Sequence, residues 1–125
     1  MKIFNFAKDA GNAITLFGSI NMVMSRIIQI GKGRYPYWMY SHLEANGKIG
    51  EHAASTDQLL LIVSGSGQVK GKENVFQDVT RNDAVLWERT EMHKTITEAG
   101  LTAIVIEGNS IDPAPYLPMK QGHSY

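Results

Sequence analysis

The chain has 125 residues, a length that fits one domain built around one hydrophobic core. Its 12 basic and 12 acidic residues cancel, so the basic face that a nucleic-acid-binding protein needs is not expected. The absence of cysteine excludes disulfides, a thiolate nucleophile and cysteine-bound zinc or iron–sulfur clusters. The sequence shows neither a signal peptide nor a membrane span, and we expect a cytoplasmic protein.

The pattern of apolar residues predicts short β-strands over most of the chain. The expected strands, in chain order, are 20–30, 35–43, 58–64, 68–72, 75–79, 84–87, 93–97 and 101–107. Turns are expected at Asn46-Gly47 and at Gly65-Ser66-Gly67. Many short strands separated by turn residues are typical of an all-β sandwich or barrel.

The two ends of the chain differ from this strand region. Residues 9–17 are expected to form one short N-terminal helix. Residues 109–125 carry Pro113, Pro115 and Pro118, and proline cannot donate a hydrogen bond to a sheet, so a surface arm is expected there. We therefore expect a single domain, 1–125, with its barrel over about 20–108.

The segment QLLLIVS, 58–64, is apolar on both faces of the strand that it predicts. Alternation places Gln58, Leu60 and Ile62 on one face, with Leu59, Leu61 and Val63 on the other. Because both faces are apolar, the outer one needs a cover, either an N-terminal strand or a second subunit. This run, the aromatic stretch 35–40 and the zero net charge together favour a homodimer.

The middle of the chain resembles the first motif of the small single-domain cupins, the cupin type-2 conserved barrels. That motif runs glycine, five residues, His-x-His, three or four residues, glutamate, six residues, glycine. His52 falls on the first histidine, Ala54 on the second and Gln58 on the glutamate. Gly65 falls on the closing glycine, and the opening glycine is displaced by one position, to Gly47.

The second cupin motif is matched less completely. It runs glycine, five residues, Pro-x-Gly, two residues, histidine. Asn82, Glu88 and Thr90 stand for the glycine, the proline and the second glycine, and His93 lands on the histidine. Sixteen residues, 66–81, separate the motifs, and LTAIVIEG at 101–108 looks like the closing strand of such domains.

The resemblance implies an all-β fold, the cupin double-stranded β-helix or jelly-roll barrel. It also implies a site of three histidines and one glutamate around iron, manganese, nickel, copper or zinc. Here only His52 and His93 remain, with an amide at Gln58 and a methyl at Ala54. A neutral amide is a weaker donor than a carboxylate. We therefore expect His52, Gln58 and His93 to hold a divalent transition metal weakly, unless His42 replaces a lost ligand.

The candidate ligand pocket is wider than this set. Even spacing puts Trp38, Tyr40 and His42 on one strand face, and His93 shares a face with Thr95. The expected pocket comprises His42, His52, Gln58, Leu60, Ile62, His93, Thr95, Trp38 and Tyr40. Apolar walls with a few polar groups are the usual form of a small-molecule site. Either motif histidine could act as a general base near neutral pH.

Three classes of function follow from these patterns. The first is a small-molecule-binding or sensing barrel without a tightly bound metal, and its ligand is unknown. The second is a metal-dependent enzyme, a dioxygenase or an isomerase, with a depleted ligand set. The third is a structural or interaction protein whose barrel is filled by its own side chains. Neither a G-x-S-x-G elbow nor a Walker loop is present, and no catalytic residue is assigned.

Overall fold

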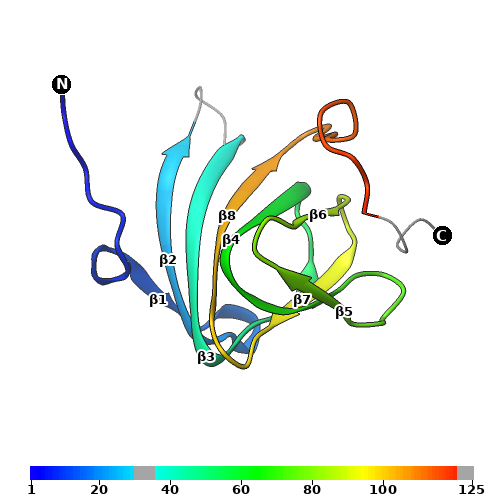
Figure 1. Cartoon of the computed structure of the whole chain (residues 1–125), viewed down its shortest axis with the longest axis horizontal. Coiled ribbons are helices and arrows are strands. Elements are labelled where there is room, and N and C mark those ends of the chain that lie inside the picture. Colours follow the sequence, from blue (N-terminus) through cyan, green and yellow to red (C-terminus); the bar gives the residue numbers. More distant parts are fainter. Residues whose placement is uncertain (30–35, 121–125) are drawn as a thin grey trace.

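The computed structural model describes residues 1–29 and 36–120, and the chain in these ranges is built of antiparallel strands (Figure 1). The strands are β1 (Asn12–Ile14), β2 (Ile20–Gln29), β3 (Tyr37–Ala53), β4 (Asp57–Lys70), β5 (Gln77–Thr80), β6 (Ala84–Trp87), β7 (Met92–Ile96) and β8 (Leu101–Gly108). The all-β prediction is confirmed. The predicted strand ends at 30 and 35 lie outside the described residues.

Two long strands close the sheet into a barrel. Strand β3 pairs with β8 through residues 37–43 and with β7 through residues 48–53. Strand β4 pairs with the same two strands, with β8 through residues 57–65 and with β7 through residues 68–70. Because β3 and β4 share both partners, the four strands form a ring, as Figure 1 shows. Strand β2 continues the sheet from β3, and β1 extends it beyond the expected start of the barrel at residue 20.

The two expected turns are bends inside these long strands. Asn46 has a φ of 61° within β3, and Gly65 has a φ of 81° within β4. A Cβ added to Gly65 would lie 2.2 Å from the carbonyl oxygen of Gly100, so no side chain fits there. The chain therefore changes direction at both expected places, but within continuous strands and not between separate ones. A bend lets one strand pair with one partner before it and with another after it, and closure of the barrel requires this.

The predicted helix over 9–17 is also wrong. The segment contains two 3-10 turns, η1 (Lys8–Ala10) and η2 (Leu16–Gly18), on either side of β1. A Cβ added to Gly11 would lie 2.7 Å from Cγ1 of Val23, so the backbone here packs directly on β2. Pairing with the edge of β2 satisfies backbone groups that an isolated helical turn would leave open.

The core lies inside the barrel, where inward-facing residues of every long strand meet. Leu60 and Ala103 have no exposed surface, and Val105 is only 1% exposed. The core cluster consists of Met22, Tyr37, Met39, Leu43, Leu60, Ile62, Val69, Val79, Trp87, Leu101, Ala103 and Val105.

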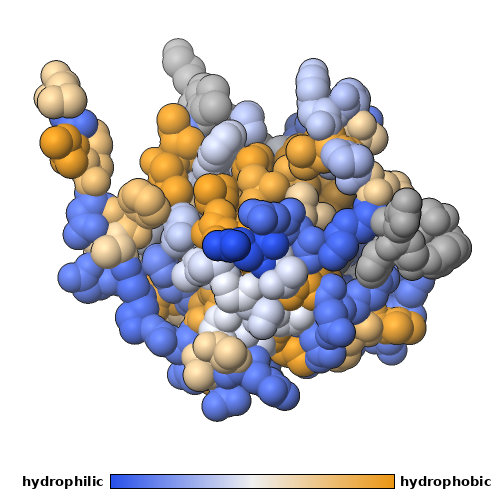
Figure 2. Space-filling model, viewed as in Figure 1, coloured by the Kyte–Doolittle hydropathy of each residue, from blue (hydrophilic) through white to orange (hydrophobic). Residues whose placement is uncertain are grey.

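Apolar side chains also reach the surface at the N-terminus. Figure 2 shows the projecting N-terminal segment at the upper left, where Ile3 is 88% exposed and Phe4 is 83% exposed. At the other end, residues 109–120 contain neither helix nor strand, as expected for a surface arm. No helix within the described ranges is long and apolar enough to cross a membrane.

Candidate functional site

His52 and His93, far apart in the sequence, meet inside the barrel. They are register partners on β3 and β7, and their ring centroids are 4.3 Å apart. His93 is 2% exposed, whereas His52 is half-buried. The structure therefore brings together the two histidines that the motifs single out.

A one-residue bulge in β3 directs His52 inward. Ile49 pairs with Thr95, and the next pair along the ladder is His52 with His93. Three residue steps on β3 thus oppose two steps on β7, which is the arrangement of a β-bulge. Ile49 packs against the core and Thr95 is buried, so His52 follows them on the inner face.

Backbone carbonyls determine which ring nitrogen of each histidine carries the hydrogen. Nδ1 of His52 lies 2.7 Å from the carbonyl oxygen of Gly50, and Nδ1 of His93 lies 3.1 Å from that of Glu91. A carbonyl only accepts, so both Nδ1 atoms donate. In the neutral rings Nε2 is then a hydrogen-bond acceptor.

The Nε2 atom of His93 is buried and has no hydrogen-bond partner among the residues that the structure describes. Burial is the main cause that lowers the pKa of His93 below its ordinary value, and the nearby His52 lowers it further. The hydrogen bond to the Glu91 carbonyl opposes this shift. His93 is therefore neutral at pH 7 and presents an unused acceptor. Leaving such an acceptor unpaired costs about 1–3 kcal/mol.

Gln58 belongs to the same end of the barrel. It is the register partner of Trp87 on β6 and of Glu107 on β8, both of which are buried. Cross-strand partners share a face of the sheet, so the half-buried Gln58 also faces the interior. The ring of Trp87 lies 4.6 Å from that of His93, which joins Gln58 and the histidines into one region.

Three further residues of the expected pocket, Leu60, Ile62 and Thr95, face the same interior. They are at most 2% exposed, so they form the walls beyond the histidine pair rather than an open surface.

Sequence reasoning missed a buried hydrogen bond beside Gln58. The hydroxyl of Tyr37 donates to Oε2 of Glu107 over 2.6 Å, and both residues are 8% exposed. A signal was available, because Glu107 is the only charged residue in LTAIVIEG and lies on the same strand face as the inward-facing Leu101, Ala103 and Val105.

The structure does not bring Trp38, Tyr40 and His42 to the histidine pair. They alternate along β3 with residues buried in the core, so their side chains occupy the outer face of the sheet. The ring of Tyr40 contacts those of Phe6, at 5.1 Å, and His42, at 4.6 Å. The expectation that His42 replaces a lost ligand is therefore wrong in this arrangement.

The side chains present match the family's metal site only in part. Within the described ranges, no group of three or more His, Cys, Asp or Glu side chains could hold a metal ion. The buried Ala54 offers a methyl where the motif has a histidine. A Nδ1–H held by a carbonyl is typical of ligating histidines, but two imidazoles and the amide of Gln58 make an incomplete set. Weak metal binding stays a prediction.

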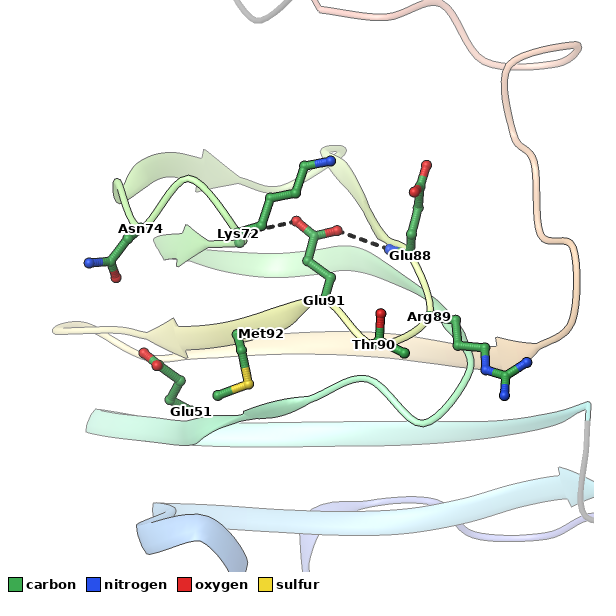
Figure 3. A pocket seen from close by; sticks show the side chains of 9 residues that line it. Glu51, Lys72, Asn74, Glu88, Arg89, Thr90, Glu91 and Met92 are labelled. Carbon is green, nitrogen blue, oxygen red and sulfur yellow. Dashed lines mark hydrogen bonds between the residues drawn. The ribbon is translucent and has the colours of Figure 1, made fainter.

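An external groove of about 520 Å³ lies at the start of β7 and the loop before it (Figure 3). Its lining residues are Glu51, Gly71, Lys72, Asn74, Glu88, Arg89, Thr90, Glu91 and Met92. The carboxylate of Glu91 accepts from the backbone N–H groups of Lys72 and Glu88, and so links two loops. The backbone carbonyl of Glu91 also accepts from Nδ1 of His93, so the groove borders the histidine region.

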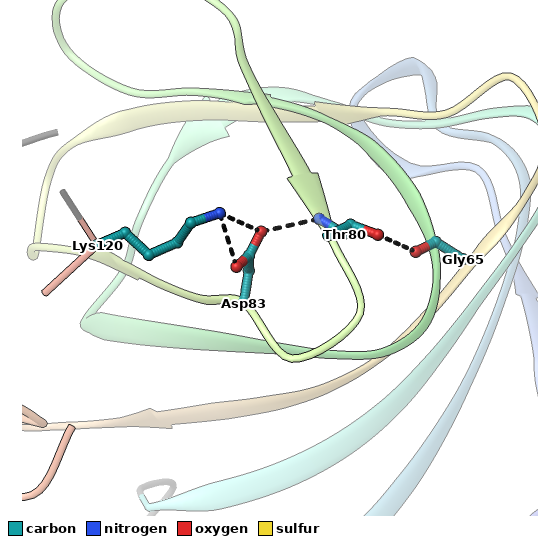
Figure 4. Close-up of polar contacts among 4 residues, drawn as sticks. All are labelled: Gly65, Thr80, Asp83 and Lys120. Atoms are coloured by element: carbon teal, nitrogen blue, oxygen red, sulfur yellow. Dashed lines mark hydrogen bonds and ion pairs between the residues drawn. The ribbon is translucent and has the colours of Figure 1, made fainter. Parts of the chain in front are cut away.

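A second external groove, of about 530 Å³, lies where the C-terminal arm meets the barrel. Lys120 forms an ion pair with Asp83 over 3.0 Å, and Asp83 also accepts from the N–H of Thr80 (Figure 4). The ion pair between Lys120 and Asp83 holds the end of the C-terminal arm against the barrel.

Comparison of the amino-acid sequence with protein-family models and with curated proteins gives no match. The fold, in contrast, is similar to solved structures. A cupin superfamily protein from Desulfitobacterium hafniense is 12% identical with a TM-score of 0.64, over 71% of this chain and 78% of that chain. A cupin-2 domain from Rhodospirillum rubrum is 12% identical with a TM-score of 0.66, over 82% and 70%.

A third similar structure is a predicted oxalate decarboxylase from Thermotoga maritima, 11% identical with a TM-score of 0.68, over 82% of this chain and 96% of that chain. At such low identity these similarities establish the fold alone. The chain has the fold of a small cupin, a jelly-roll barrel, as the motifs predicted.

Proposed function

We propose that this cupin barrel binds a small molecule at the inner end of the barrel, beside His52, Gln58 and His93, without a tightly bound metal. The observation that carries this proposal is the buried Nε2 of His93, which has no partner among the described residues. A hydroxyl or N–H group of a ligand would donate to this atom and remove the cost of leaving it unpaired.

The neighbouring groups suit such a ligand. The amide of Gln58 both donates and accepts, and Gln58 and His52 are only half-buried, so a ligand can reach them. The buried carboxylate of Glu107 is already engaged by Tyr37, so its hydrogen bond helps to hold this end of the barrel in shape.

The test is a small-molecule screen by thermal shift on three proteins: wild type, His93→Gln and His42→Gln. His42 is the matched control because its Nε2 is also buried without a partner among the described residues, but it lies on the outer face of the sheet. Compounds that stabilise wild type and His42→Gln, but not His93→Gln, support the proposal. A screen whose stabilising compounds all act equally on His93→Gln contradicts it, as does a screen without any stabilising compound.

A metal-dependent enzyme is the second candidate. The observation that favours it is that both histidines are oriented by carbonyls, as metal ligands usually are. Elemental analysis of gently purified protein separates the two candidates. Less than one divalent metal per chain agrees with the first, and one tightly held metal per chain makes the enzyme the better explanation.

A further inference from the structure

The first six residues form an N-terminal arm that carries large apolar side chains into solvent. Residues 1–6 belong to neither helix nor strand, and Figure 1 shows them projecting from the barrel beside β2. Ile3 is 88% exposed, Phe4 is 83% exposed and Phe6 is 55% exposed. Burying one phenyl group is worth a factor of about ten or more in an equilibrium constant. The arm therefore gains stability from any apolar surface that covers it.

An apolar patch on the outer face of the sheet offers such a surface. Ile28, Trp38 and Ile106 are register partners on β2, β3 and β8, so their side chains lie next to one another. Ile28 is 48% exposed, Trp38 is 38% exposed and Ile106 is half-buried. Tyr40 and Ile104 form the next row on the same face and are also half-buried. These five residues, which we call the outer apolar patch, carry no charge.

One ring of the arm already contacts this patch within the same chain. Phe6 meets Tyr40 with ring centroids 5.1 Å apart and planes at 64°, a normal edge-to-face arrangement. The patch thus accepts a phenyl group from this very segment. Trp38 lies two residues before Tyr40 on the same face of β3, and its exposed surface offers a place for a second ring.

A local turn separates Phe4 from the patch of its own chain. Oδ1 of Asn5 accepts from the N–H of Ala7 over 2.8 Å, which is the bond of an Asx turn. After this turn the chain enters η1 and β1, and the pairing of β1 with β2 fixes it to the barrel. The arm is therefore held at Phe6 and directed away from the barrel before it, as Figure 2 shows.

We propose that two copies of this chain exchange their N-terminal arms, so that Phe4 of one copy packs on Trp38 of the other. Ile3 accompanies Phe4 in the arm, and Ile28 and Ile106 flank Trp38 in the patch. Each copy has one arm and one patch, so a twofold axis makes the contact twice. The zero net charge of the chain does not oppose the approach of a second copy. The exchange does not involve the histidines and goes beyond the proposed function.

Sedimentation of the full chain over a dilution series tests the arm. The wild type should dimerise, and Phe4→Ser should weaken the dimer by at least about tenfold, because each copy loses a buried phenyl group. Tyr116→Ser is the matched control, since Tyr116 is an aromatic residue of similar exposure, 86%, on the C-terminal arm. It should dimerise as the wild type does. A monomeric wild type, an unchanged Phe4→Ser dimer or equal weakening by Tyr116→Ser overturns the proposal.

A mixture of two variants tests the exchange itself. Phe4→Ser keeps an intact patch and Trp38→Ser keeps an intact arm, so neither variant alone forms a complete contact. In the mixed dimer the arm of Trp38→Ser meets the patch of Phe4→Ser, and one of the two contacts is restored. Native mass spectrometry should show a mixed dimer at least about tenfold tighter than the dimer of either variant. A mixed dimer that is not tighter than both means that arms meet arms or patches meet patches, and overturns the exchange.

Discussion

His42 and His52 lie on the same strand, an even number of residues apart, yet they face opposite sides of the sheet. His42 sits between Ser41 and Leu43, which are buried in the barrel, and its own ring contacts Tyr40 on the outside. His52 pairs with His93 inside. An uninterrupted strand would place both histidines on one face.

The bulge between Ile49 and His52 explains the difference. It adds one residue to β3 and reverses the alternation for the part of the strand that follows. A histidine therefore belongs to the candidate site because of the pairing around it, and not because of its spacing from other histidines. The same contrast between an inner and an outer face can be tested on each long strand.

The largest expected effect is on β4, where Leu60 faces the core and Leu61 faces outward. Leu60 has no exposed surface, so Leu60→Ala should lower the free energy of unfolding by about 3 kcal/mol. Leu61→Ala should cost about 1 kcal/mol or less, because the side chain is only half-buried. Urea denaturation measures both. Equal losses would mean that the outer face is packed as tightly as the core.

Restoring the family's ligands tests whether the inner face forms one site. Ala54→His with Gln58→Glu would supply three imidazoles and one carboxylate, the full set of the motif. Metal at a hundredfold excess over its dissociation constant should then stabilise the variant by about 2.7 kcal/mol, read as a rise in melting temperature.

Two additional replacements control this experiment. Adding His93→Ala to the restored variant should abolish the gain, whereas adding His42→Ala should leave it, because His42 lies on the other face. A restored variant that folds but shows no metal-dependent shift would mean that the two motifs are wrongly aligned.

The dependence of stability on pH should follow the inner histidine. Because burial depresses the pKa of folded His93, the unfolded chain takes up its proton first as the pH falls. The contribution of His93 to the free energy of unfolding is therefore fully present above the unfolded pKa of about 6.5. This contribution is lost as the pH falls toward the folded pKa. Each unit of separation between the two pKa values contributes about 1.4 kcal/mol.

Urea denaturation at a series of pH values between 5 and 7.5 measures this loss. His93→Gln should flatten the profile, and His42→Gln should keep its slope. A His93→Gln profile as steep as that of the wild type would assign the dependence to other groups.

The smallest effect on the stability of the single chain is expected on the outer face. We predict a homodimer at micromolar concentration, formed through this face. Trp38→Ser should weaken the dimer, because Trp38 is an apolar side chain that is 38% exposed there, while costing the single chain only about 0.5 kcal/mol. Phe76→Ser is the control, since Phe76 is equally exposed, at 37%, on another part of the surface. Light scattering that gives only a 13.8 kDa particle for the wild type would contradict the prediction.

The sequence predicted the central residues of the candidate site, but it did not predict which other residues surround them. The motif spacing singled out His52, Gln58 and His93, and the structure places all three facing the interior. The same reasoning added Trp38, Tyr40 and His42, because even spacing says which residues share a face but not which face it is. It missed Phe17, whose ring stacks on that of His52 with centroids 4.2 Å apart, since a residue in an isolated turn carries no periodic signal.

The sequence by itself determined most of the strands and, within each uninterrupted strand, which residues share a face. Strand β6 has the predicted bounds, and β8 extends the predicted 101–107 by one residue, because short apolar runs bounded by turn residues depend on local preferences. Only the tertiary structure decided that the turns expected at Asn46 and Gly65 are bends inside β3 and β4, which partners these strands take on either side and which way His52 points. These features depend on pairing between segments that are distant in the sequence. The effect of a glycine or of one extra residue is set by the neighbouring strand with which it pairs.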